Sequence, residues 1–305
     1  MINSVYRLIA PGMIEVACTQ PDIKNSVLLR PVYLSVCKAD QRYYLGNRSR
    51  EALKAKLPMA LIHECVAKVV FDPTGNFKPG EIVVPVPNTP TEDDDVIAEN
   101  YRPSSRFCSS GYDGFLRDYI DISPDRLVRV PDGIDLRIAS FAELISVCVH
   151  AIARFEKFSH VRKNSIGIWG DGNVGFITAL ILKILYPETK LYVFGTVYDK
   201  LAYFSFADGA YHVDHVPEGL KVDHAFECVG GEGSRFAIAQ IIDLINPEGT
   251  VGLMGVSERF VDINKKEVNR TSTLPGTGAS GMRSEMPYIY LLPYWMGRYH
   301  GLIGD

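Results

Sequence analysis

The chain has 305 residues, of which 47% are hydrophobic and 22% charged, and its formal net charge is −4. This length accommodates two domains, and the slight negative charge argues against a general nucleic-acid-binding surface. No apolar run is long enough to span a bilayer and the first residues lack a signal-peptide pattern, so we expect a cytoplasmic protein that binds neither membrane nor nucleic acid. Six irregularly spaced cysteines favour thiols or metal ligands over a disulfide framework.

Residues 1 to about 140 predict an all-β domain of short strands. Val27–Val36 is strand-like but contains Pro31, which indicates a bulge or an edge position. His63–Phe71 is rich in valine, and Ile82–Pro85 is a further short apolar run. Pro87–Arg106 is acidic and contains prolines, so it predicts a long surface loop. Short strands separated by turn residues are typical of a small barrel or sandwich.

Five residues in or just after this part have the chemistry of metal ligands. Cys37 ends a strand and is followed by Asp40, while His63 and Glu64 open another strand and Glu143 opens a helical run. A thiolate, an imidazole and a carboxylate, with one position open to water or substrate, make the ligand set of a catalytic zinc. The alternative is a buried structural cysteine, a hydrogen-bonded histidine and solvated carboxylates. Spacing alone does not decide, because the ligands have to converge in space.

A glycine-rich turn lies between a predicted buried strand, Ser165–Trp169, and a predicted apolar helix, Phe176–Leu185. Its sequence is G-x-G-x-x-G in the strand–turn–helix context of a dinucleotide site. The first glycine permits the turn, the second lets the backbone approach a pyrophosphate, and the third lets helix pack on strand. The predicted cofactor contacts are Gly170, Gly172, Asn173, Val174 and Gly175. The alternative is an ordinary glycine-rich connection.

The next predicted strand, Lys190–Phe194, ends in Gly195 and Thr196. Proteins specific for NAD usually place an acidic residue there to bind the ribose hydroxyls, and this sequence has none. Thr196, Tyr198 and Lys200 could instead hold a 2′-phosphate. The segment therefore favours NADPH over NADH, with a solvated loop as the alternative.

Together, these pieces resemble the zinc-dependent medium-chain alcohol and polyol dehydrogenases. The likeness covers about residues 1 to 268. The matching segments are Ser35–Asp40, Ile62–Glu64, Phe77–Val83, Gly111–Phe115, Asp118–Tyr119, Glu143–Leu144, His150–Ala151, Gly170–Gly175, Phe226–Gly231 and Gly249–Gly255. Val86–Glu92, Ile97–Tyr101 and Gly167–Asn173 resemble more closely the bacterial ribulose-5-phosphate reductases, which supply ribitol 5-phosphate for CDP-ribitol.

The resemblance implies a fold of class α/β plus all-β. Residues 1–140 would form a GroES-like β-barrel catalytic domain and residues 141–268 a Rossmann domain with a doubly wound parallel sheet, followed by a divergent tail, 269–305. The implied activity is NADPH-dependent reduction of a ketopentose phosphate, D-ribulose 5-phosphate, feeding teichoic acid or capsule polymers. A homodimer and a partner ribitol-5-phosphate cytidylyltransferase are also implied.

The resemblance assigns Cys37, His63, Glu64 and Glu143 as ligands of one catalytic zinc, the two glutamates exchanging places as water or substrate binds. Asp40 would orient a ligand or a backbone group, and the alternative for it is a turn aspartate. The family's proton-relaying hydroxyl is replaced by Ala39, which leaves water, Ser35, Tyr43 or a ligand carboxylate as relay. A lobe that holds a structural zinc in many relatives is absent, since the corresponding loop has only Cys108, so we expect one metal per chain.

Two cations beside the Cys37 segment, Lys38 and Arg42, are candidates for the substrate phosphate. The alternative is that both are solvated surface charges.

From about Asn269 the sequence departs from the family pattern and shows no clear helical or strand period. Two hypotheses account for this segment: a shifted reading frame that gives a truncated product, or a genuine variant terminus. Two alternative functions accompany them: a polyol- or threonine-type dehydrogenase acting on an unphosphorylated substrate, and a non-catalytic remnant that binds nucleotide.

Overall fold

The computed structural model describes residues 1–102, 104–256 and 272–273. Two compact units divide this part of the chain, the first running from Met1 to Ser146 and the second beginning at Val147, so that the division falls within helix α4 (Ala142–Phe158). The domain boundaries that we expect after residues 140 and 268 stay predictions. Most of the expected divergent tail, 269–305, lies outside the described residues.

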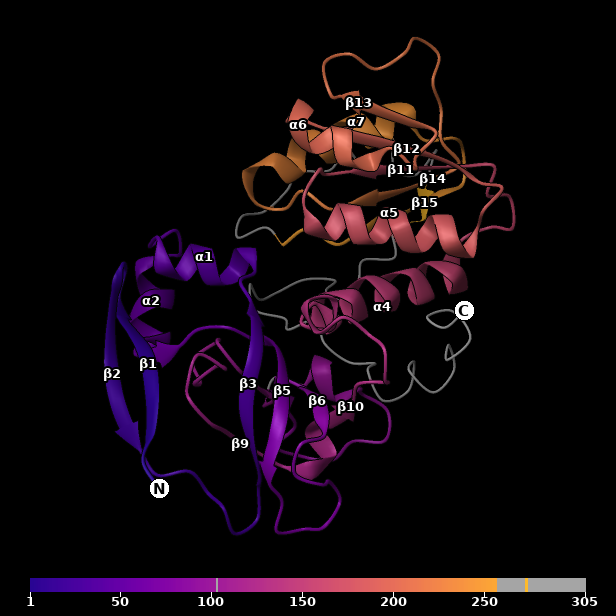
Figure 1. Ribbon diagram of the computed structural model, residues 1–305. Coiled ribbons are helices and arrows are strands. Elements are labelled where there is room, and N and C mark those ends of the chain that lie inside the picture. Colours follow the sequence, from indigo (N-terminus) through magenta and orange to yellow (C-terminus); the bar gives the residue numbers. More distant parts are fainter. Residues whose placement is uncertain (103, 257–271, 274–305) are drawn as a thin grey trace. The chain divides into compact units, whose positions relative to one another are not determined.

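The first unit contains two antiparallel sheets (Figure 1). A small two-stranded ribbon is separate from both. The sheet orders are β10-β6-β5-β3-β9 and β2-β1-β4, and β7 pairs with β8. The strands are β1 (Asn3–Ala10), β2 (Met13–Thr19), β3 (Val27–Ser35), β4 (Met59–Ala60), β5 (Glu64–Phe71), β6 (Ile82–Pro85), β7 (Asn88–Thr89), β8 (Arg106–Phe107), β9 (Ile120–Ile122) and β10 (Leu127–Arg129). The helices are α1 (Lys38–Tyr44), α2 (Arg50–Lys56) and α3 (Leu136–Ala139), with 3₁₀ turns η1 (Glu99–Tyr101) and η2 (Pro124–Arg126).

Apolar residues of both sheets share one core. Leu8 of β1 and Met59 of β4 are fully buried in the same cluster as Leu29 of β3 and Val83 of β6. Each strand turns alternate residues to one face, so each sheet contributes an apolar face to this core. The outcome agrees with the barrel or sandwich that the short strands predict.

Pro31 produces the predicted bulge in β3. The register between β3 and β5 shifts between Pro31 and Tyr33. On the other side, β9 pairs only with residues 27–29 of β3, so the missing N–H of Pro31 removes no ladder bond there. β5 begins at Glu64 rather than at His63, and the predicted loop 87–106 contains β7 and η1.

The second unit is a parallel sheet in the order β13-β12-β11-β14-β15-β16. Its strands are β11 (Ser165–Trp169), β12 (Lys190–Gly195), β13 (Gly209–His212), β14 (His224–Glu227), β15 (Gly249–Leu253) and β16 (Ser272–Thr273). Its helices are α5 (Asn173–Leu185), α6 (Tyr198–Leu201) and α7 (Ser234–Leu244), with 3₁₀ turns η3 (Ala202–Phe204) and η4 (Gly231–Gly233). The chain order reverses between β11 and β14, which defines the switch point where such sheets bind ligands.

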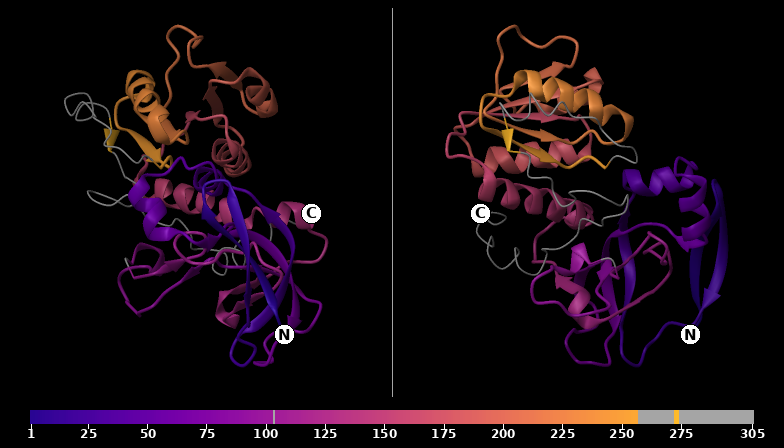
Figure 2. Two further views of the ribbon diagram at one scale, coloured as in Figure 1. Left: turned by 90° about the vertical axis from the view of Figure 1, so that its left-hand side faces the viewer. Right: turned by 180° about the vertical axis from the view of Figure 1, so that it is seen from behind.

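Helices cover both faces of this sheet, α5 on one and α7 on the other (Figures 1 and 2). Ile166 and Ile168 of β11 are buried with Leu182 of α5, whereas Trp169 is buried with Ile241 of α7. A doubly wound sheet requires two buried faces, and the predicted fold class is confirmed.

Helix α5 starts at Asn173, three residues earlier than predicted, because the glycine turn leads directly into it. The sixth strand, β16, pairs in parallel with β15 and comes from the segment where the sequence shows no strand period. All six cysteines are free thiols. In the parts of the chain described above, each helix is too short or too polar to cross a membrane.

Candidate metal centre and nucleotide turn

Cys37 follows β3 and caps the N-terminus of α1. Its Sγ accepts a hydrogen bond from the backbone N–H of Ala39 at 3.2 Å, and the Asp40 carboxylate accepts one from the Cys37 N–H, also at 3.2 Å. These reciprocal bonds form a capping box, in which cap and third helical residue satisfy each other's backbone. The local sequence thereby fixes the position of the thiol.

His63 and Glu64 follow a backbone turn at Ile62, whose φ is +73°. A β-branched residue is an outlier in this left-handed region, so the surrounding structure has to hold it there. Asp40 Oδ1 accepts the Ile62 N–H at 2.9 Å. A Cβ at Gly114 would lie 2.3 Å from the Ile62 carbonyl oxygen, so only glycine allows this close approach. The turn places two predicted metal ligands in succession, His63 just before β5 and Glu64 at its first residue.

The four predicted metal ligands converge within the first unit. Cys37 Sγ lies 3.2 Å from His63 Nε2. Glu143, in the first turn of α4, is buried, and ligand atoms of His63, Glu64 and Glu143 lie within 4.8 Å of one another. Cys37, Asp40 and His63 form an overlapping group under the same criterion.

This donor set fits a divalent cation. His63 Nδ1 and both carboxylate oxygens of Glu64 are buried without a hydrogen-bond partner in the described part of the chain. Burial, then the charge of Asp40, raises the pKa of Glu64 to about 7, and burial with the Glu64 charge raises the pKa of Glu143 well above its usual range. Burial also raises the pKa of the Cys37 thiol. A thiolate, an imidazole and carboxylates with unsatisfied atoms are the ligand types that zinc takes.

Three hydrogen bonds from the protein occupy most of the accepting capacity of the Asp40 carboxylate. It is buried, and its Oδ1 accepts both the Ile62 N–H and the Ser109 hydroxyl, the latter at 2.7 Å. The imidazole Nδ1 of His63 lies 3.7 Å from the same oxygen. These contacts favour the orienting role that the resemblance implies. Ser109 and the ring of Phe107, 5.3 Å from that of His63, were missed by the sequence reasoning, which had no signal for either.

The structure narrows the choice of proton relay. Ser140 Oγ donates to the carbonyl of Arg137, so the Ser35 hydroxyl, 2.6 Å away, directs its hydrogen to Ser140. Tyr43 is buried, with the guanidinium of Arg48 lying 4.8 Å from the centre of its ring. Water, Tyr43 and a ligand carboxylate therefore stay as candidates.

Lys38 and Arg42 both lie on α1, which begins directly after Cys37. Residues four apart on a helix share one face. Lys38 is exposed and Arg42 half-buried. The two cations therefore lie on one side of the helix that carries Cys37, a predicted metal ligand, at its start.

The predicted nucleotide turn has the required geometry. Gly170 has a φ of +127°, and a Cβ at Gly175 would lie 2.0 Å from the Gly170 carbonyl oxygen. A Cβ at Gly172 would meet no atom of the described residues within 4 Å, so that this part of the chain leaves the space at the start of α5 open. Among the described residues, no side chain caps α5, and Asn173 and Val174 form its first turn. An uncapped N-terminus beside open space suits an anion such as a pyrophosphate.

Asp171, inside the turn, joins it to the end of β12. Its Oδ2 accepts the backbone N–H groups of Thr196 at 2.8 Å and of Val197 at 2.9 Å. A Cβ at Gly195 would lie 2.7 Å from the same carboxylate oxygen, so Gly195 makes room for it. Lys200 Nζ lies 4.0 Å from Asp171 Oδ1. The sequence reasoning did not assign this bridging role.

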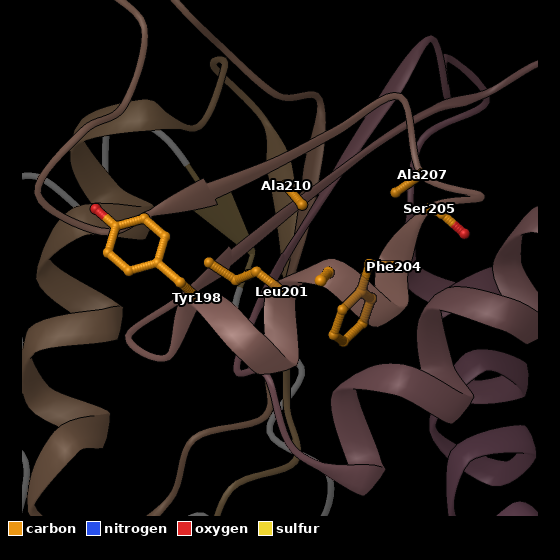
Figure 3. A pocket seen from close by; sticks show the side chains of 7 residues that line it. Tyr198, Leu201, Phe204, Ser205, Ala207 and Ala210 are labelled. Atoms are coloured by element: carbon orange, nitrogen blue, oxygen red, sulfur yellow. The ribbon is translucent and has the colours of Figure 1, made fainter.

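A surface pocket beside α6 is a different feature (Figure 3). Its lining is apolar except for two hydroxyls, and consists of Tyr198, Leu201, Ala202, Phe204, Ser205, Ala207 and Ala210. Such a lining has no cation or metal donor, so it does not match the chemistry of the two sites above.

Comparison with known proteins agrees with this arrangement. Residues 23–132 match the family model of the alcohol dehydrogenase GroES-like domain. The chain is 55% identical over 285 residues to ribulose-5-phosphate reductase 1 of Staphylococcus aureus, a match covering 93% of this chain and 84% of the relative. It is 53% identical to ribulose-5-phosphate reductase of Bacillus spizizenii, covering 92% of this chain and 83% of the relative.

The crystal structure of S. aureus TarJ in complex with NADPH is similar, with 50% identity and a TM-score of 0.78, covering 90% of this chain and 80% of that one. The fold and the matches to known proteins define the class of this protein, an alcohol dehydrogenase with a GroES-like domain. Within that class the chain belongs to the ribulose-5-phosphate reductase family. Because the alignment spans 93% of the chain, the likeness extends past residue 268, where we expected it to end.

Proposed function

We propose that the chain reduces the keto group of D-ribulose 5-phosphate to give D-ribitol 5-phosphate, with NADPH as hydride donor and one catalytic zinc. The relatives at 55% and 53% identity are named for this reduction, and the solved structure at 50% identity holds NADPH. The observation that carries the proposal is the convergence of Cys37, His63, Glu64 and Glu143 in a chain this similar to those enzymes.

The chain's residues divide into metal holders and a positioning group. When bound, zinc polarises the ketone oxygen, and NADPH supplies the hydride. Cys37 and His63 would hold the ion, with Glu64 and Glu143 offering carboxylate oxygens. Asp40 positions Cys37 and the backbone before His63 through its hydrogen bonds. The proton for the product oxygen then comes from water, Tyr43 or one of the carboxylates.

NADPH would lie along the carboxyl ends of the parallel strands. Gly170, Gly172 and Gly175, with Asn173 and Val174, would hold the pyrophosphate at the start of α5. Thr196 and Lys200, after β12, would face the 2′-phosphate, because β12 ends in Gly195 rather than in the acidic residue that binds the free ribose hydroxyls in NAD-specific proteins.

The proposal extends to the place of the reaction in the cell. The product would feed CDP-ribitol for teichoic acid or capsule polymers, so that a ribitol-5-phosphate cytidylyltransferase is the expected partner. The reaction would take place in the cytoplasm, with the enzyme as a homodimer. The resemblance described above is what supports these statements.

The test is an assay of NADPH oxidation with ribulose 5-phosphate, run beside zinc analysis. We expect turnover with ribulose 5-phosphate and little with ribulose. Cys37→Ser should lose zinc and activity, whereas Cys18→Ser, an exposed cysteine on β2, should keep both. Preferential turnover of ribulose would point to a polyol dehydrogenase, and nucleotide binding without turnover to a non-catalytic remnant. Either result contradicts the proposal.

A further inference from the structure

Three aromatic side chains gather where β12 and β13 end: Tyr198 follows β12, His212 is the last residue of β13, and His215 follows it. The ring of Tyr198 stacks on that of His212, with centroids 4.8 Å apart and planes at 17°. The Tyr198 hydroxyl lies 3.0 Å from Nδ1 of His215, and the two imidazole centroids are 5.6 Å apart. We call Tyr198, His212 and His215 the aromatic cluster.

Hydrogen bonds anchor the cluster to the end of β12. The backbone N–H of Asp214 donates to His212 Nδ1 at 3.3 Å, so Nε2 carries the imidazole proton. His212 Nε2 then donates to the carbonyl of Thr196 at 3.2 Å. Gly195 and His212 are also register partners in the parallel pairing of β12 and β13. The cluster is therefore fixed beside Thr196, the residue that directly follows β12.

The cluster leaves a donor and a ring face accessible. Tyr198 is 62% exposed, so one face of its ring rests on His212 while the other side is open to solvent. Figure 3 shows this ring beside the side chain of Leu201, at the edge of the surface pocket. When the Tyr198 hydroxyl donates to His215 Nδ1, the imidazole proton of His215 lies on Nε2. His215 is exposed and can offer that N–H to a ligand.

Local charge does not by itself make this a phosphate site. Lys200, a nearby cation, lies 4.0 Å from the Asp171 carboxylate, and Asp214 Oδ2 lies 3.5 Å from His212 Nδ1. Asp199 adds another carboxylate in α6. A phosphate held here therefore depends on directed hydrogen-bond donors more than on net positive field, since hydrogen bonds to charged groups contribute roughly 1.5–3 kcal/mol each.

We propose that the aromatic cluster selects the 2′-phosphate of NADPH, with His215 Nε2–H as the discriminating donor and Tyr198 as the group that positions it. Thr196 and Lys200 would complete the contact. This inference rests on the proposed function, because it assumes that the dinucleotide lies outside the carboxyl ends of the strands. The proposal adds His212 and His215 to the cofactor site. Neither the glycine motif nor the end of β12 indicates these two residues.

The test measures binding of two adenosine fragments, 2′,5′-ADP and 5′-AMP, to the purified full chain by calorimetry. His215→Ala should raise the Kd of 2′,5′-ADP about tenfold, the equivalent of one lost hydrogen bond to a charged group, and leave the Kd of 5′-AMP unchanged. Tyr198→Phe keeps the ring stack but frees His215, so it should raise the Kd of 2′,5′-ADP by a smaller factor. Tyr203→Phe, 72% exposed in η3, is the matched control and should change neither Kd.

Equal losses for both fragments, or no loss in His215→Ala, would overturn the assignment. The melting temperature of each variant shows whether it is folded. We expect little change in it, because these side chains lie at the surface. Failure of the proposed function would give a result different from failure of this inference. A wild-type chain that binds both fragments with equal affinity and turns over NADH as well as NADPH has no 2′-phosphate preference for any residue to confer.

Discussion

Asp40→Asn tests how the metal centre is held. Asp40 Oδ1 accepts two hydrogen bonds, from the Ile62 N–H and the Ser109 hydroxyl, and Oδ2 accepts the Cys37 N–H. The amide oxygen of asparagine can still accept the bonds from the Ile62 N–H and the Ser109 hydroxyl. The amide NH₂ then faces the Cys37 N–H, so that two donors point at each other. One bond to a charged acceptor is then lost and a buried donor is left unpaired, at a cost of roughly 2 kcal/mol.

The substitution should affect zinc binding because the backbone of Cys37 would shift. Cys37 caps α1, so a shifted Cys37 backbone displaces the thiol from His63. Groups that orient metal ligands typically contribute a factor of about 10–100 to metal affinity, which is roughly 1.4–2.7 kcal/mol. We therefore expect Asp40→Asn to weaken zinc binding by about that factor, measured by competition with a chromophoric chelator.

A control separates this effect from general destabilisation. Asp113→Asn removes a carboxylate in the same unit that accepts from the Arg7 guanidinium and the Ala60 N–H. It should lower the melting temperature without changing zinc affinity. If Asp40→Asn melts lower but binds zinc within about twofold of wild type, Asp40 serves only the fold and the reasoning is wrong.

Three further predictions concern substrate, cofactor and acid stability. Replacing Lys38 and Arg42 by alanine should raise KM for ribulose 5-phosphate about tenfold or more and leave KM for NADPH unchanged, because a cation–phosphate contact is lost. Gly172→Ala should keep the melting temperature, since its Cβ enters open space, but weaken NADPH binding; Gly175→Ala should destabilise the unit, since its Cβ would lie 2.0 Å from a carbonyl oxygen. Burial, then a neighbouring imidazole, lowers the pKa of His224 to about 4, so the unfolded chain takes up a proton below about 6.5 and the folded one does not. Stability should therefore fall as pH drops from about 6.5 toward 4, by up to roughly 3 kcal/mol.

Each of these predictions has an outcome that would contradict it. Lys54→Ala, exposed on α2, should not change KM, and an equal effect from it would remove Lys38 and Arg42 from the phosphate site. NADPH binding unaffected by Gly172→Ala would place the pyrophosphate elsewhere. For His224, urea unfolding followed from neutral pH into acid should show a decline, and a flat profile would contradict the sign of the pKa shift.

Local requirements made part of the fold predictable. Gly170 adopts a positive φ, and at Gly175 a Cβ would clash with a carbonyl oxygen. Both positions require glycine, and the sequence has glycine at both. Pro31 likewise indicates the bulge in β3, because a residue without an N–H cannot join a regular ladder. Such constraints act within a few residues, so the sequence displays them directly.

Long-range constraints were not predictable from residues alone. Ile62 has no local signal for a positive φ, which is imposed by Asp40 and by the close approach at Gly114. The contacts of Ser109 and Asp171 also depend on segments that only folding brings together. The convergence of Cys37 with distant ligands was expected through resemblance to a family, not through spacing.

We propose that Cys37, His63, Glu64 and Glu143 share one metal ion. The most direct measurement is the metal content of the purified chain by mass spectrometry, for wild type and for His63→Ala beside His215→Ala as a surface control. We predict about one zinc per chain in the wild type and in the control, and almost none in His63→Ala. A wild-type chain without zinc, or a His63→Ala variant that retains it, would contradict the claim.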